Sequence, residues 1–173
     1  MRPAAIVCSL VASAVAIAGE PKAPEKNDSA RSETERVLSA LRGTWAVTEY
    51  GADGAPVAKG RETWRPGPGG RSLIEEYHST DSHGADYAGF ALGWWDDQAQ
   101  GFRITWCDNR ETHGCKILSE AAQWQGATWV VSDAEFKEIF SEITPNSFTQ
   151  TIYSEAPEGM RADLKIEGKR ISR

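Results

Sequence analysis

The sequence lacks the features that mark several large classes of protein. Its 173 residues hold 19 Lys and Arg against 25 Asp and Glu, so no basic excess is present to neutralise the phosphates of nucleic acids. Its longest uncharged run is shorter than the roughly 20 residues of a membrane-spanning helix. The motifs Gly-x-Ser-x-Gly and His-Glu-x-x-His and a phosphate-binding glycine loop are missing. These absences argue against a nucleic-acid binder and a multispan membrane protein, and they predict no catalytic residue and no cofactor.

Cysteine and methionine are scarce, with three and two residues respectively. Cys8 lies in an uncharged run from Ala4 to Ala18, which ends in the small-x-small pattern that signal peptidase accepts. We therefore expect residues 1–18 to be a cleaved signal peptide. The mature protein would be exported, periplasmic or extracellular, without a stable membrane anchor. Removal of this segment leaves 18 basic and 25 acidic residues, which is a net charge of −7.

The two remaining cysteines, Cys107 and Cys115, flank a loop rich in turn-forming residues. An even pair of cysteines in an exported protein favours a disulfide. A redox pair or a metal site is less favoured, because the sequence has no Cys-x-x-Cys and no second thiol pair. The spacing therefore predicts a disulfide-linked hairpin, with one cysteine ending a strand and the other starting the next.

The segment after the expected signal changes character twice. Residues 19–31 contain two prolines and no aromatic or β-branched residue, which is typical of a solvated tether. Ser32 followed by Glu35 then forms a capping box, and three apolar residues after it share one helical stripe. The pattern predicts a helix over 33–42 and a single folded domain over 32–173 that includes it.

The sequence after this helix predicts short strands separated by Gly-, Pro- and Asp-rich turns. Apolar and polar residues alternate within the strands, as expected for antiparallel sheets with one buried face. About ten hairpin-linked strands would curl by twist, and closure into an up-and-down barrel removes the exposed edges. A two-sheet sandwich is the alternative. The expected strands are 44–50, 60–65, 71–79, 87–95, 102–107, 115–124, 127–133, 135–143, 147–154 and 160–169.

A short helix followed by Gly43-Thr44-Trp45 resembles the calycin motif of lipocalins and fatty-acid-binding proteins. Further Gly and Trp residues, notably Gly93-Trp94-Trp95-Asp96 and Ile104-Thr105-Trp106-Cys107-Asp108, resemble the bacterial lipocalin-like proteins grouped as a domain of unknown function, DUF1579. The resemblance covers about residues 35–169. It implies a ten-stranded barrel with an N-terminal helix across one end, and it brings no established activity. Trp45 is expected to plug the core beneath the helix.

Seven Trp residues, all between Trp45 and Trp129, would either line or fill such a barrel. One face of the strand 87–95 carries three Gly or Ala residues between Tyr87 and Trp95. These small side chains would leave room for a ligand, or else fit against bulky partners. We expect a small apolar or amphipathic molecule in the lumen, with Tyr87, Trp95 and Trp106 as its aromatic lining.

The two strands before this one place charged residues among the aromatic ones. Arg61 lies on one face of the strand 60–65, and Glu75 and Tyr77 share a face of the next. Facing inward, they would fix the polar head of an amphipathic ligand, with Arg61 paired to Glu75. Facing outward, they would be ordinary solvated charges. Two alternatives remain: an enzyme using Glu75 or Tyr77 as acid or base, and a filled barrel acting through an outer-surface protein contact.

The three histidines, His78, His83 and His113, give little support to a metal or haem site. Lipocalin-like haem binders hold iron through a His late in the chain, and none follows His113. His78 and His83 flank Asp81, a spacing that fits no familiar metal-ligand pattern. We therefore predict no metal site.

Overall fold

The computed structural model describes residues 27–110 and 114–172. The expected signal peptide, most of the expected tether and His113 lie outside this part of the chain. The described residues form one α-helix, one short 3-10 helix and eleven strands, and all neighbouring strands are antiparallel. The predicted all-β class with an N-terminal helix is therefore confirmed. No helix in these two ranges is long and apolar enough to cross a bilayer.

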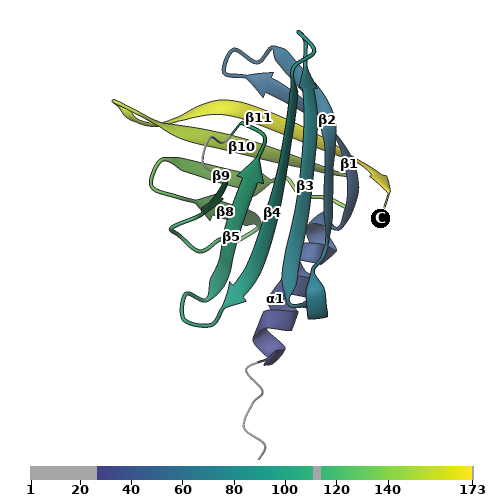
Figure 1. Cartoon of the computed structure of the whole chain (residues 1–173), viewed down its shortest axis with the longest axis vertical. Coiled ribbons are helices and arrows are strands. Elements are labelled where there is room, and N and C mark those ends of the chain that lie inside the picture. Colours follow the sequence, from purple (N-terminus) through teal and green to yellow (C-terminus); the bar gives the residue numbers. More distant parts are fainter. Residues whose placement is uncertain (1–26, 111–113, 173) are drawn as a thin grey trace, which may run out of the picture.

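The strands follow one another around a single sheet in the order β6-β5-β4-β3-β2-β1-β11-β10-β9-β8-β7. Figure 1 shows this sheet curling around a common interior, with α1 at one end. The elements are α1 (Asn27–Leu41), β1 (Gly43–Gly51), β2 (Pro56–Pro66), η1 (Pro68–Gly70), β3 (Ser72–Asp81), β4 (Asp86–Asp96), β5 (Gly101–Asp108), β6 (Cys115–Ile117), β7 (Gln123–Gln125), β8 (Thr128–Ser132), β9 (Phe136–Ser141), β10 (Ser147–Ala156) and β11 (Gly159–Ser172).

The helix begins earlier than the capping box predicts. It starts at Asn27 instead of residue 33, so the end of the expected tether is helical and Ser32 is not the N-cap. Ala30, which precedes the predicted start, is buried along with the later apolar residues of the helix, so the buried stripe begins earlier than the capping box indicates. Burial in the fold, which local sequence signals do not report, therefore accompanies the earlier start of the helix.

The sheet does not close through a regular ladder of ten strands. The expected strand 115–124 is divided into β6 and β7, and residues 118–122 between them follow β5 irregularly, with a single bridge from Ala122 to Phe102. Glu120, which a regular strand would turn inward, is exposed and accepts a hydrogen bond from the Ser132 hydroxyl at 2.5 Å. The two edge strands, β6 and β7, are thus joined by five residues that form no regular ladder. The sheet curls into a barrel, but its closure at this place is incomplete.

A disulfide and an ion pair hold this irregular region in place. Cys107 on β5 faces Cys115 on β6, and the predicted disulfide joins them. Across the irregular seam, the Asp133 carboxylate accepts a hydrogen bond from the Ser119 amide at 3.1 Å and pairs with the Lys116 ammonium at 2.6 Å. Side chains therefore connect β6 to the end of β8 where the backbone ladder is missing.

The end of the barrel beside α1 is closed around Trp45. Gly43 has a φ of 116°, a conformation that favours glycine, and it turns the chain sharply from helix to strand. Trp45 is fully buried, and its indole N–H donates to the Leu41 carbonyl at 2.7 Å. The Arg170 guanidinium from β11 lies 3.8 Å from the Trp45 ring and donates to the Ala40 carbonyl at 3.0 Å. The expected core plug is confirmed.

Aromatic rings fill this end of the lumen. The Phe148 ring lies 4.9 Å from Trp45 and 5.6 Å from Phe140, and Phe102 lies 5.4 Å from Trp129, measured between ring centroids. Edge-to-face and tilted arrangements of this kind are favourable for aromatic pairs. We refer to this part of the lumen, built around Trp45, Phe102, Trp129, Phe140 and Phe148, as the filled end.

Candidate functional site

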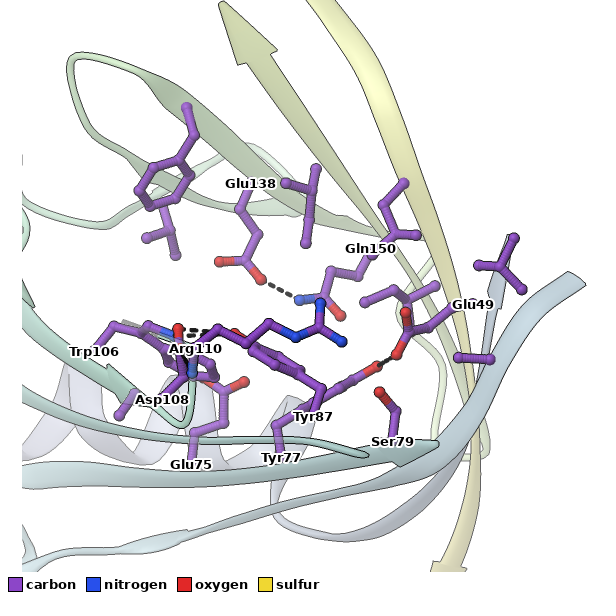
Figure 2. A pocket seen from close by; sticks show the side chains of 18 of the residues that line it. Glu49, Glu75, Tyr77, Ser79, Tyr87, Trp106, Asp108, Arg110, Glu138 and Gln150 are labelled. Carbon is purple, nitrogen blue, oxygen red and sulfur yellow. Dashed lines mark hydrogen bonds between the residues drawn. The ribbon is translucent and has the colours of Figure 1, made fainter. Parts of the chain in front are cut away.

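The opposite part of the lumen contains a cavity of about 680 Å³. Its walls come from β1 to β5 and from β8 to β11, so every long strand contributes to it. Aliphatic side chains form much of the surface, and Figure 2 shows the polar and aromatic ones that project into the space. The seven Trp residues therefore do not fill the whole interior, which disfavours a completely filled barrel.

Four of the six expected binding residues line this cavity: Glu75, Tyr77, Tyr87 and Trp106. Trp95 does not. It lies on the lumen face, but its ring packs 5.3 Å from Phe102 at the filled end. The sequence pattern places Trp95 on the correct face of β4, but it does not say how far along the lumen the cavity extends.

Arg61 is exposed on the outer face of β2, so the expected Arg61–Glu75 pair does not form. Glu62 and Trp64, the alternate residues, face inward and are buried. Charged residues occur on both faces of this strand, and an inward carboxyl next to Trp would ordinarily be disfavoured by its desolvation cost. The structure nevertheless buries the Glu62 carboxyl and leaves the Arg61 guanidinium in solvent.

The small residues of β4 serve both of the purposes considered. A Cβ on Gly89 would come within 2.0 Å of the Trp106 indole, so this glycine makes space for an aromatic neighbour. Ala91 instead borders the cavity, next to Glu75 on β3 and Trp106 on β5. One small residue thus accommodates a ring, and the other leaves open space.

Two tyrosines with carboxylate partners form one side of the cavity. The Tyr77 hydroxyl donates to Glu49 at 2.8 Å, and the Tyr87 hydroxyl donates to Asp108 at 3.2 Å. The Trp106 indole N–H also donates to Asp108, at 2.9 Å. Burial, followed by the neighbouring carboxylates, raises the pKa of both tyrosines, so their hydroxyls remain protonated.

Arg110 lies on the same side, where its guanidinium stands 4.8 Å from the centre of the Tyr87 ring. It is exposed, and it is the only basic residue that borders the cavity among those the structure describes. The carboxyl-bearing residues at the cavity are Glu49, Glu75, Asp81, Asp108 and Glu138. The cavity wall is therefore acidic overall.

Three carboxyl groups interact at the inner part of the lumen: Glu62 and Glu75, which are buried, and Glu138, which is half-buried. Burial raises the pKa of Glu62 to about 8 and that of Glu138 to about 7. Burial, and then the charges of the other two, raise the pKa of Glu75 well above its usual value. Near neutral pH these groups consequently hold protons that exposed carboxyls would have lost. We call the three residues the carboxyl cluster.

Gln150 adds a further polar group on the wall opposite Glu75. Its amide N–H donates to the Glu138 carboxyl, and it is 3% exposed. Its amide oxygen has no hydrogen-bond partner among the described residues, and the same is true of one Glu62 oxygen. Figure 2 shows Glu138 and Gln150 on one side of the cavity and Glu75 and Tyr77 on the other. The inner lumen therefore contains buried oxygen atoms that no donor of the described residues reaches.

Glu62, Glu138 and Gln150 are absent from the residues expected from sequence. Glu138 lies between Phe136 and Phe140 on the same face of β9, and Gln150 lies between Phe148 and Ile152 on the same face of β10. A polar residue whose neighbours two positions away on the same strand are apolar is the signal that would have indicated Glu138 and Gln150.

The histidine region offers no metal site among the residues that the structure describes. His78 is exposed on the outer face, 3.8 Å from Asp86. The Asp81 carboxylate accepts hydrogen bonds from the backbone amides of His83 and Ala85, at 2.8 and 2.9 Å, and so stabilises its own turn. His113 lies outside the described residues.

No family model and no curated protein matches the chain. Among solved structures, it is similar to a de novo designed fluorescence-activating β-barrel, with 13% identity, a TM-score of 0.44, and coverage of 78% of this chain and 96% of that one. It is also similar to a redesigned β-barrel, mFAP1, bound to DFHBI, with 16% identity, a TM-score of 0.46, and coverage of 78% and 99%. At such low identity and TM-score, this likeness implies nothing about the ligand of the present chain.

Proposed function

We propose that this protein is an exported, lipocalin-like barrel that binds a small apolar or amphipathic molecule in its lumen. The observation that supports this most directly is the cavity of about 680 Å³, which lies within the usual size range of small-molecule sites. Its lining combines aliphatic walls with a few buried polar groups, the combination that holds an apolar body and orients a polar end.

Two further features support the lipocalin-like and exported parts of the proposal. The helix, the Gly43 turn and the Trp45 plug are consistent with the resemblance to the calycin motif of lipocalins. The Cys107–Cys115 disulfide is the kind of bond that persists in oxidising compartments. Cell fractionation and N-terminal sequencing test export, with a mature chain beginning at residue 19 as the expected result. An unprocessed cytoplasmic protein would contradict it.

Titration with a chemically diverse panel of fluorescent fatty acids and coloured cofactors tests ligand binding. Trp64 and Trp106 border the cavity, so a bound ligand should produce a saturable change in Trp emission. Ala91→Phe would fill part of the cavity and should abolish this change. Ala88→Phe, on the opposite face of the same strand, is the matched control and should leave it intact. Absence of any saturable change across the panel would contradict the proposal.

An enzyme acting in the same lumen is the second candidate, and the burial of Glu75 is the observation that favours it. A buried carboxyl with a raised pKa can act as a general acid near neutral pH. Tyr77 is less suited, because its pKa is raised further from neutrality. The test is chemical: ligands found by titration are recovered after incubation and analysed by mass spectrometry. Altered ligand that disappears with Glu75→Gln would support catalysis, whereas unchanged ligand supports binding alone.

A further inference from the structure

The inner cavity contains polar oxygen atoms that lack a hydrogen-bond donor. Glu75 is 8% exposed and has no hydrogen-bond partner among the described residues, although it borders the cavity. The Gln150 amide oxygen is also buried and unpartnered. Its orientation is fixed, because the other end of the amide donates to Glu138. Buried acceptors without donors cost free energy, so a ligand that supplies donors at this place would bind favourably.

The electrostatic character of the cavity specifies which kind of donor fits. Five carboxyl-bearing residues border the cavity, and Arg110, the one basic residue among the described lining, lies against Tyr87. Glu62 adds a further buried carboxyl behind the wall. An anionic head group would meet repulsion here, and a neutral head group would satisfy fewer acceptors. A protonated primary amine supplies three N–H donors and a positive charge.

Resting on the lumen-binding function proposed above, we propose that the ligand is an amphipathic molecule with a protonated primary amine, held by Glu75, Glu138 and Gln150. Tyr77 and Tyr87 line the same cavity and offer ring faces that attract a cation. The apolar body of the ligand packs against the aliphatic wall made by residues such as Val131, Ile152 and Leu164.

Protons and the amine compete for the same carboxyl groups. In the empty protein, burial keeps the carboxyl cluster partly protonated near neutral pH. An ammonium group takes the place of these protons, so its binding releases them and becomes tighter as pH rises from about 6 to 8. The other titratable groups that line the same cavity are Glu49 on β1, Tyr77 and Asp81 on β3, Tyr87 on β4, Asp108 on β5, and Arg110 just after β5.

A series of three ligands with the same chain tests the proposal. Decylamine, decanol and decanoate are titrated separately into the protein by isothermal calorimetry at pH 7.5. We expect decylamine to bind about tenfold or more tightly than decanol, and decanoate to bind weakest. In buffers of different ionisation enthalpy at pH 6.5, decylamine should release protons and decanol should not. Equal affinities, or a preference for decanoate, would overturn the amine assignment.

Glu75→Gln and Glu76→Gln form a matched pair on adjacent positions of β3. Glu75 faces the cavity, whereas Glu76 faces solvent and pairs with Arg65 at 2.8 Å. Glu75→Gln should lower decylamine affinity about tenfold and leave decanol affinity unchanged, while Glu76→Gln should change neither. Near-UV circular dichroism verifies the fold of both variants. Equal decylamine binding by both variants would overturn the role of Glu75.

The outcomes separate this inference from the lumen-binding function. If decanol or a panel ligand binds but decylamine has no advantage, the amine assignment fails and the lumen-binding function stands. If no ligand of the series or of the diverse panel binds, both fail.

Discussion

The two ends of the lumen are built from the same strands but have opposite character. Beside α1, the interior is closed by packed rings, such as Trp45 and Phe148, whose centroids lie 4.9 Å apart. Beyond Trp64, the same strands enclose open space bordered by carboxyl, amide and phenol groups. The difference indicates that the two ends of the barrel have separate roles. The filled end stabilises the fold, and this stability supports buried polar groups that would be unfavourable alone.

Replacement of a phenylalanine at each end should give the largest contrast. Phe148 is 2% exposed within the filled end, so Phe148→Ala should lower the free energy of unfolding by about 3–5 kcal/mol. Phe136 borders the cavity and is half-buried, so Phe136→Ala should cost only about 1–2 kcal/mol. Urea unfolding measures both. Similar losses at the two positions would contradict the distinction between a packed end and an open one.

Removal of the disulfide should affect the open end in particular. Cys107 and Cys115 join β5 to β6 beside Trp106 and Asp108. The double variant Cys107→Ser/Cys115→Ser should lose about 2–3 kcal/mol of stability, because the unfolded chain is no longer constrained. Ligand affinity should fall as well. Wild-type protein treated with reductant is the control and should behave like the variant. A stability loss without any change in affinity would show that the bond does not support the cavity.

A smaller effect is expected from pH, and its sign is opposite to that of an ordinary surface carboxylate. The pKa of Glu138 is about 7 in the folded protein and near the ordinary 4.5 in the unfolded chain. The folded state therefore holds an additional proton between these values, and its stability falls as pH rises toward 8. Between pH 8 and 5.5, wild type should gain about 1–2 kcal/mol more stability than Glu138→Gln.

The control for this pH effect is Glu76→Gln, which removes a carboxyl from the outer face and should leave the pH dependence of wild type unchanged. Urea unfolding at the two pH values provides the measurement. A wild-type protein that is more stable at pH 8 than at pH 5.5 would show that the carboxyl cluster is not buried as described.

Local sequence patterns predict the features that depend on neighbouring residues better than those that depend on distant ones. The helix stripe, the Gly43–Trp45 turn and the cysteine pair depend on neighbouring residues, and the structure has each of them. The irregular segment 118–122 and the start of the helix at Asn27 depend on contacts with distant strands. No local signal reports such contacts.

The candidate site shows the same limit in its chemistry. Glu75 and Tyr77 follow from their shared parity with apolar neighbours on β3. Glu62 and Glu138 escape prediction because the cost of burying a carboxyl normally places it outside. The prediction for Arg61 is wrong because its positive charge suggests a partner for Glu75, whereas the structure places Arg61 in solvent. Residues that contradict the ordinary rules of burial are those most informative about the ligand.

A crystal structure of the protein grown with decylamine would show whether the open end of the lumen holds an amine. We expect electron density for the alkyl chain in the cavity of about 680 Å³, with the nitrogen of decylamine within hydrogen-bond distance of Glu75 and Glu138. An empty cavity, or a chain bound with its nitrogen in solvent, would contradict this expectation.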